Sequence, residues 1–310
     1  MGSKILILGN GFDLDLGLKT RYSDFWSSTL WTQAKNQCQE PYLVKSLERY
    51  RVTHHWFDLE SGLEKGAFSL NKKLGTDFDN TNYLQSFQLL KEKLKLYIQN
   101  QQSSFSPPKN CVAEYLLREI TYNGAFRRIY TFNYTDLKYL ASQMNVDSLP
   151  DCIHVHGSLE SGDDIILGIE TEDFKSIPEQ LTFLIKSNSQ YYRNNSLLDD
   201  ITNADEVIFF GHSINGMDFP YFKEYFRMLS QRNDPEEKKR RVTIITYDET
   251  SSSQIKDNMR FNGIDVRTLY NRVKLDFILT KDINDGSDFQ TKKLSNLLHN
   301  LKSTGFISHY

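Results

Sequence analysis

Apolar residues in this chain form short continuous runs. Longer segments lie between the runs, and in them apolar residues recur at the spacing of a helix. The first run, residues 4–8, is continuous and stops at Gly9-Asn10-Gly11, which is typical of a buried parallel strand followed by a tight turn. Strand-like runs return only after residue 108. They cover residues 128–132, 152–156, 165–168, 206–210, 242–247 and 264–269.

The intervening segments carry apolar residues three and four positions apart, which predicts helices. Residues 22–37 form one such segment, and residues 84–98 form another that ends before Pro107-Pro108. We find no convincing strand over residues 42–102. The alternation of strands and helices predicts a Rossmann-like α/β fold with a doubly wound, mostly parallel sheet. We expect a single domain over residues 1–310, with a helical insertion at about residues 42–110.

Composition narrows the function classes. The 310 residues include 37 basic and 40 acidic side chains, a net charge of −3 that does not indicate nucleic-acid binding. No run of ~18 apolar residues indicates a membrane span, and the N-terminus does not resemble a signal peptide, so we expect a cytoplasmic protein. The three isolated cysteines exclude a four-cysteine zinc site, and we expect no metal.

Polar residues cluster where predicted strands end, and in open α/β sheets ligands bind outside these carboxyl ends. Gly9-Asn10-Gly11-Phe12-Asp13 is the first cluster, and its glycines would let the backbone approach a phosphate. Glycine is equally common in tight turns that bind nothing. Leu14 stands where the dinucleotide motif of dehydrogenases has a third glycine, which disfavours a dehydrogenase but not a nucleotide site.

Two further clusters carry candidate catalytic groups. Asn133 follows the predicted strand 128–132, and its amide can hold a water or a ribose hydroxyl, or cap the next helix. His154 and His156 project to the same face if both lie on the strand 152–156. His156 stands directly before Gly157 and is the better candidate base, whereas His154 is better explained as a structural histidine.

The fourth cluster is Gly211-His212-Ser213, with Asn215 and Asp218 close behind. Gly211 would let a ligand lie against the backbone, and Ser213 would contact a phosphate. An ordinary strand-to-loop turn explains the same residues.

These clusters resemble the AbiH proteins, a bacterial phage abortive-infection family. The resemblance rests first on Gly9-Asn10-Gly11-Phe12-Asp13 and on residues 17–25, Gly-Leu-Lys-Thr-Arg-Tyr-Ser-Asp-Phe. The clusters around Asn133, His156 and Gly211 fit the same family. The family in turn resembles a divergent branch of the sirtuin-like NAD-binding fold.

The sirtuin resemblance implies roles for individual residues. The Thr-Gln-Asn-Ile-Asp motif of sirtuins is similar to residues 131–135, which implies that Asn133 contacts ribose and water, and their catalytic histidine corresponds to His156. Glu60, in an Asp-Leu-Glu element similar to one in sirtuin-like defence effectors, would line the pocket. The residues implied to bind the nucleotide are Gly9, Asn10, Gly11, Phe12, Asp13, Thr131, Gly157, Gly211, His212 and Ser213.

The sequence also departs from sirtuins. It lacks the cysteine quartet of the protein deacetylases, and residues 19–25 replace the Pro-Asp-Phe-Arg element. We therefore expect hydrolysis of NAD at the nicotinamide–ribose bond, with Asn133 and His156 catalytic, under control of a homo-oligomer or a partner protein. The alternatives are a nucleotide-sensing module without catalysis, and an enzyme acting on another nucleotide or on nucleic acid.

Overall fold

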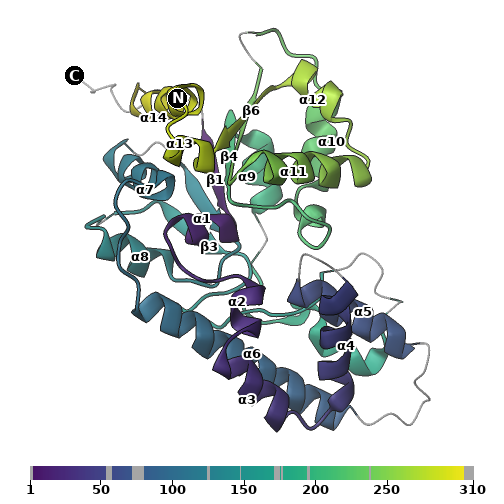
Figure 1. Cartoon of the computed structure of the whole chain (residues 1–310). Helices are drawn as coiled ribbons and strands as arrows, with labels where there is room; N and C mark the ends of the chain where they lie inside the picture. The colour runs from purple at the N-terminus through teal and green to yellow at the C-terminus, as the bar shows by residue number, and fades with distance from the viewer. Residues whose placement is uncertain are drawn as a thin grey trace. The chain divides into compact units, whose positions relative to one another are not determined.

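The computed structural model describes residues 3–53, 58–71, 80–123, 126–146, 148–170, 175, 177–193, 196–236 and 239–303. The chain forms two compact units (Figure 1). Unit 1 comprises Met1–Leu18, Phe105–Val155 and Arg193–Tyr310, and unit 2 comprises Lys19–Ser104 and His156–Tyr192.

Unit 1 is built on a parallel sheet. Its strands are β1 (Lys4–Leu8), β2 (Arg128–Thr131), β3 (Asp151–His154), β4 (Glu206–Phe210), β5 (Arg241–Thr246) and β6 (Lys274–Leu279). They lie in the order β3-β2-β1-β4-β5-β6, and every pair is parallel. This confirms the predicted Rossmann-like α/β sheet. Leu8 is in register with Thr131 on one side and Phe210 on the other, so β1, β2 and β4 end level at one edge.

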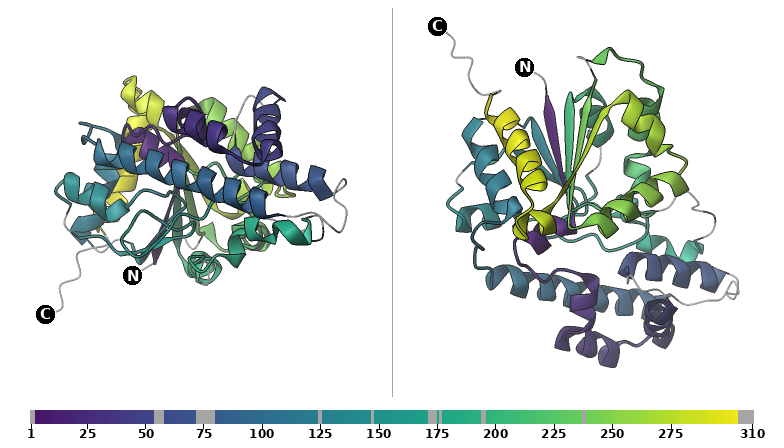
Figure 2. Two further views of the ribbon diagram at one scale, coloured as in Figure 1. Left: turned by 90° about the horizontal axis from the view of Figure 1, so that it is seen from below. Right: turned by 45° about the horizontal axis from the view of Figure 1, so that its top comes forward.

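Helices cover both faces of this sheet. They are α1 (Asn10–Asp15), α7 (Val112–Asn123), α8 (Leu137–Gln143), α9 (Leu197–Asn203), η4 (Phe219–Tyr221), α10 (Lys223–Gln231), α11 (Glu249–Phe261), α12 (Val266–Arg272), α13 (Thr280–Asn284) and α14 (Asp288–Ser303). In Figure 2, right, α7 and α14 lie on one side of the strands and α10 to α12 on the other.

Alternation along the strands explains the two faces. Leu6 and Leu8 of β1 join a buried cluster with apolar residues of α7, α8 and α14. On the opposite face, Phe209 of β4 stacks on Phe226 of α10, with ring centroids 5.9 Å apart. Both faces of the central strands are therefore buried, which is why these strands read as continuous apolar runs.

Two of the predicted strands are wrong. The run at residues 264–269 contains the start of a helix, α12, instead of a strand. The Asp265 side chain accepts a hydrogen bond from the Arg267 N–H and so caps this helix. The last strand is instead β6, where Leu275 and Phe277 are buried and Asp276 is exposed. Residues 165–168 lie in no named strand, and the next residue, Ile169, forms an isolated bridge to Ile185.

Unit 2 is mainly helical among its described residues. It contains α2 (Tyr22–Trp26), α3 (Thr29–Gln37), α4 (Pro41–Thr53), α5 (Leu59–Asn71), α6 (Thr81–Ser103) and the 3₁₀ helices η2 (Glu179–Leu184) and η3 (Lys186–Asn188). The helix predicted over residues 22–37 is divided, because Ser28 caps α3 by accepting from the Trp31 N–H. Helices α4 to α6 occupy the predicted insertion. The single domain over residues 1–310 stays a prediction.

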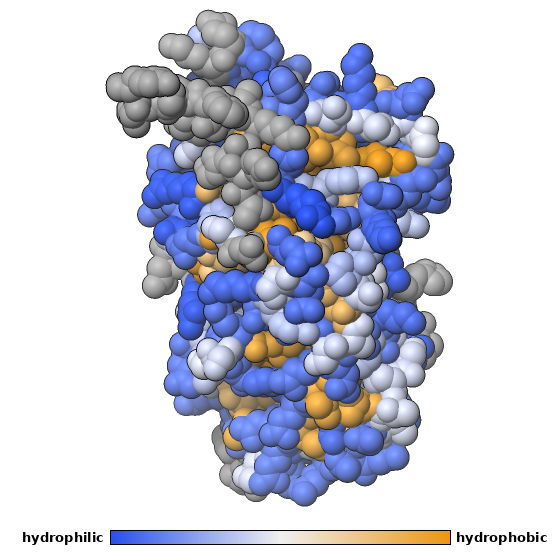
Figure 3. Space-filling view, turned by 90° about the vertical axis from the view of Figure 1, so that its left-hand side faces the viewer, coloured by the Kyte–Doolittle hydropathy of each residue, from blue (hydrophilic) through white to orange (hydrophobic). Residues whose placement is uncertain are grey.

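The helices of the described residues are all too short or too polar to cross a membrane. On the surface drawn in Figure 3, small apolar areas interrupt a mostly hydrophilic face. Scattered apolar groups of this kind are normal for a folded protein and need no special explanation.

Candidate functional site

Asn133 joins the carboxyl ends of β1 and β2 in unit 1. Its side-chain Nδ2 donates to the Gly9 carbonyl (3.1 Å) and to Asp13 Oδ1 (2.8 Å). Both amide hydrogens are thereby used inside the protein, since an asparagine NH₂ group has two. The orientation of the amide is therefore fixed, and its oxygen, Oδ1, is the atom that remains to accept a hydrogen bond from a ligand.

Asp13 completes this arrangement from α1. Thr135 Oγ1 donates to Asp13 Oδ2 at 2.8 Å, so each carboxylate oxygen accepts one bond from a neutral donor. The side chain is buried, and burial raises its pKa from 3.8 to about 7, although the bonds from Thr135 and Asn133 act in the opposite direction. Asp13 is therefore a buried residue that holds the Asn133 amide in place through this bond.

The helix-cap explanation of Asn133 is wrong. Asp136 caps α8 by accepting from the Tyr139 N–H at 3.0 Å. The Asn133 N–H donates instead to Thr131 Oγ1 at 3.1 Å, and its carbonyl faces His154 Nδ1 at 3.4 Å. The loop after β2 thus holds Asn133 from its backbone as well as from its side chain.

The glycine turns after β1 and β4 interlock. Gly9 N–H donates to the Phe210 carbonyl and Gly11 N–H to the Gly211 carbonyl, both at 2.9 Å. A β-carbon on Gly11 would lie 2.6 Å from Gly211 Cα, and one on Gly9 would lie 2.6 Å from His212 Cα. Gly211 also has a φ of +66°, which favours glycine. Close backbone approach therefore requires glycine at these positions.

This packing limits how the first turn can hold a phosphate. The N–H groups of Gly9, Gly11 and Phe12 all donate to backbone carbonyls of the protein, the last to the Gly9 carbonyl at 2.9 Å. An anion at this turn would have to bind other groups. Ser213 is exposed in the neighbouring turn, and its hydroxyl is such a group.

His212 lies in an aromatic enclosure. Its ring contacts Phe132 and Phe222 edge-on, with centroids 4.6 and 5.1 Å apart. Nδ1 accepts from the Ile214 N–H at 3.0 Å, and Nε2 lies 3.6 Å from Asp218 Oδ2. Ile214 has a φ of +48°, which is strained for a β-branched residue. His212 therefore holds a strained turn in place.

Unit 2 contains a buried group of three polar side chains, Glu60, His156 and Lys186. Lys186 Nζ donates to Glu60 Oε2 at 2.7 Å and lies 3.2 Å from His156 Nε2. β3 ends at His154, so His156 is not on the strand, contrary to the prediction. Its place is fixed by the Gly157 turn, where φ is +68° and a β-carbon would lie 1.9 Å from the Asp164 carbonyl oxygen.

The structure thus gathers part of the predicted site in unit 1. Gly9, Asp13, Thr131, Asn133 and Gly211 lie around the ends of β1, β2 and β4, together with Asn10, Gly11, Phe12, His212 and Ser213. His156 and Gly157 belong to unit 2. The binding and catalytic roles of all these residues stay predictions.

Sequence reasoning missed Lys186. A lysine directly after the apolar pair Leu184-Ile185 gives a weak signal, because long charged side chains usually reach solvent. Only the folded chain shows that this one is completely buried between an acid and a histidine.

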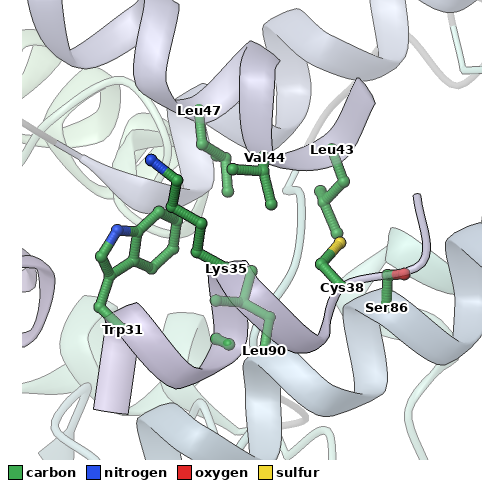
Figure 4. A pocket seen from close by; sticks show the side chains of 9 residues that line it. Trp31, Lys35, Cys38, Leu43, Val44, Leu47, Ser86 and Leu90 are labelled. Carbon is green, nitrogen blue, oxygen red and sulfur yellow. The ribbon is translucent and has the colours of Figure 1, made fainter. Parts of the chain in front are cut away.

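A small pocket lies elsewhere in unit 2, between α3, α4 and α6 (Figure 4). Its wall is mostly apolar, with Trp31, Leu43 and Leu90 beside Lys35 and Cys38. The space inside it has a volume of about 10 Å³, which is room for about one water molecule. Within the part of the chain that the structure describes, no group of His, Cys, Asp and Glu side chains is arranged to bind a metal ion.

The model of the family described as bacteriophage abortive infection AbiH matches residues 5–235. The chain belongs to the AbiH family. This membership gives it a role in phage abortive infection. The match runs from β1 to beyond β4. Asn133 with Asp13, and Lys186 with Glu60 and His156, all lie inside the matched part of this AbiH protein. No curated protein matches the chain.

Proposed function

We propose that this AbiH protein hydrolyses NAD at the bond between nicotinamide and ribose. Two findings support a dinucleotide as the substrate. The strand order β3-β2-β1-β4-β5-β6 is that of dinucleotide-binding sheets, whose ligands lie where the order reverses, here between β1 and β4. Asn133 and the glycine turns at Gly9 and Gly211, which resemble sirtuin motifs, stand at the same edge.

The fixed amide of Asn133 is the observation that carries the proposal. Its Nδ2 is bound to Gly9 and Asp13, so Oδ1 is the oriented acceptor next to the β1 end of the sheet. A water molecule or a ribose hydroxyl can donate to such an oxygen, and a carbonyl acceptor that does not rotate orients it before reaction.

The proposed reaction needs little acid catalysis. The C1′–N bond breaks with its electron pair moving to nicotinamide, which leaves as a neutral molecule because it starts as a cation. The ribose passes through an oxocarbenium-like state, water adds at C1′, and the proton of that water goes to solvent. The products are nicotinamide, ADP-ribose and a proton.

In this proposal Asn133 orients the attacking water or the ribose diol, and His156 is the base that the sequence predicts. Ser213 supplies a hydroxyl to the diphosphate in place of the glycine amides that the protein already uses. The interlocked glycine turns hold these groups in position. An NAD-consuming enzyme must be silent until needed, so control by a second copy or by a partner protein is part of the proposal.

Incubation of the purified protein with NAD, followed by chromatography for nicotinamide and ADP-ribose, tests the proposal. We expect equal amounts of both products, formed at least 100-fold more slowly by a protein carrying Asn133→Ala. If NAD binds and raises the melting temperature but stays intact, the nucleotide-sensing alternative replaces the enzyme. If NAD neither binds nor reacts, the nucleotide specificity is wrong.

A further inference from the structure

Asp13 is a buried acid that does not stabilise the fold at neutral pH. Its side chain is 2% exposed, and the two groups that bond it, the Asn133 amide and the Thr135 hydroxyl, are neutral. Burial is the main reason why its pKa is raised to about 7. Ionising a buried carboxyl group beside neutral donors costs free energy. A neutral asparagine could accept from Asn133 without that cost, so stability does not explain why this position carries an acid.

The Asn133 amide connects this acid to the ligand edge of the sheet. Its nitrogen, Nδ2, donates to Asp13 Oδ1 at 2.8 Å, and its oxygen, Oδ1, is the acceptor left for a ligand. Asn133 is 7% exposed against 2% for Asp13, so the amide is the more accessible of the two. Hydrogen bonds in a chain polarise one another. A carboxylate at Nδ2 therefore increases the negative charge on Oδ1 and makes it a stronger acceptor.

Protonation of Asp13 changes its charge but keeps its contacts. Asn133 Nδ2 can only donate, so the proton of a neutral Asp13 must lie on Oδ2, opposite the Thr135 hydroxyl, 2.8 Å away. That hydroxyl can turn and accept the hydrogen bond. The Asn133 amide cannot turn over, because its oxygen would then face the Gly9 carbonyl oxygen. Ionised and neutral Asp13 thus hold Asn133 in the same orientation.

The titratable side chains on the elements around Asp13 have contacts of their own. They are Asp15 of α1, Cys111 and Asp136 before α7 and α8, His154 at the end of β3, and His212 with Asp218 after β4. Asp15, the nearest in sequence, accepts from the Ala113 N–H at 2.8 Å. Within the described part of the chain, the hydrogen bonds to the Asp13 carboxylate come from Asn133 and Thr135. Burial and these two donors therefore determine the pH at which Asp13 ionises.

We propose that Asp13 is a positioning residue whose charge, acting through the Asn133 amide, stabilises the cationic ribose formed in the proposed NAD hydrolysis. As the C1′–N bond breaks, the positive charge moves from nicotinamide to C1′. A negative charge on the side of the ribose favours this movement. Asp13 neither gives up nor takes up a proton in the reaction. Its part in the reaction rests on the proposed function, whereas its action on Asn133 does not.

The dependence of turnover on pH tests the role in the reaction. In the unaltered protein kcat/KM for NAD should rise at least about fivefold between pH 6 and pH 8, as Asp13 ionises, with less than about a threefold change in KM. Asp13→Asn keeps the contacts and removes the charge. At pH 8 it should be about tenfold slower than the unaltered protein, and its kcat/KM should lack the rise.

Two further variants separate the charge of Asp13 from other effects. The bond from Thr135 lowers the pKa of Asp13, so Thr135→Val should move the rise to higher pH and leave its final level within about threefold. Asp15→Asn removes a neighbouring acid on the same helix but can still accept from the Ala113 N–H. This variant is the matched control and should keep the rise seen in the unaltered protein.

Nuclear magnetic resonance measures the link between Asp13 and Asn133 without NAD. The side-chain carboxyl carbon of Asp13 and the amide nitrogen of Asn133 are followed from pH 5 to pH 9 in isotope-labelled full-length protein. Their signals are assigned by their loss in Asp13→Asn and Asn133→Ser. Because the pKa of Asp13 is about 7, we expect both signals to shift with one midpoint near that pH, and the Asn133 shift to disappear in Asp13→Asn.

Different results overturn different parts of the proposal. Asn133 signals that stay unchanged while Asp13 titrates, or an Asp13 that is fully ionised at pH 5, overturn the action through the amide. A rise in kcat/KM that persists in Asp13→Asn, or that disappears in Asp15→Asn, overturns the role in the reaction. If the two signals titrate together but NAD is never cleaved, the proposed function fails while the link between Asp13 and Asn133 stands.

Discussion

Asn133 Nδ2 donates to Asp13 Oδ1 over 2.8 Å, which ties the loop after β2 to the helix after β1. The two residues are 120 positions apart in the sequence, and both are buried. The bond places the Asp13 carboxylate beside the Asn133 amide, at the edge of the sheet where β1 and β2 end. The stability and the proposed chemistry of this protein are therefore linked at one contact.

The raised pKa of Asp13 predicts a pH-dependent stability. The pKa of Asp13 is about 7 in the folded chain, and its ordinary value is 3.8. Between pH 3.8 and pH 7 the folded protein therefore binds more protons than the unfolded one. The free energy of unfolding should consequently fall as pH rises through this range, by roughly 2–3 kcal/mol between pH 5 and pH 8. Urea unfolding at several pH values measures it.

Asp13→Asn is the matched variant for that measurement. The new amide can accept from Asn133 and donate to Thr135, so the contacts remain while the titrating proton is removed. Its stability should vary less between pH 5 and pH 8 than that of the unaltered protein. Parallel pH profiles of the two proteins would assign the titration to another group.

The interlocked turns predict a steep cost for a side chain on Gly11. Gly11→Ala places a β-carbon 2.6 Å from Gly211 Cα, a backbone atom that cannot move aside cheaply. We expect a loss of about 1–3 kcal/mol in the free energy of unfolding. Gly216 has open space around it, and Gly216→Ala should change stability by less than about 1 kcal/mol. Equal losses in the two variants would show that the turns are not in contact.

The two histidines near the end of β3 should behave differently. His156→Ala is expected to lower NAD cleavage by roughly 10²–10⁴-fold with the fold preserved. His154, buried beside the Asn133 carbonyl, should act mainly on stability when changed to Ala. Cleavage rates and melting temperatures of both variants check this, and inactivity of His154→Ala with an active His156→Ala would reverse the two roles.

The central strands could be predicted because burial on both faces leaves a continuous apolar run. β1 and β4 have the predicted bounds, Lys4–Leu8 and Glu206–Phe210. The strand at one edge of the sheet, β6, was harder to predict. The region from Val266 to Leu269 looks like a strand by composition, but the Asp265 cap starts a helix there, and β6 follows with an exposed Asp276 that interrupts its apolar pattern.

The candidate site could be predicted as a set of strand ends but not as a set of contacts. The sequence places Asp13 and Asn133 after two strands, yet the bond between them depends on the register of β1 with β2. It cannot show that the amides of Gly9 and Gly11 are used by the next turn. Nor does it show Lys186 beside His156, since 30 residues separate them and no local pattern links them.

Asn133→Ala tests the proposed NAD hydrolysis most directly, because asparagine has no acid–base chemistry and acts only by position. The measurement is the rate of nicotinamide release and the affinity for NAD on the same purified variant, with its melting temperature as a control. The account predicts a folded protein that binds NAD within about tenfold of the unaltered affinity and cleaves it at least 100-fold more slowly. A variant that melts earlier but releases nicotinamide at the unaltered rate would contradict it.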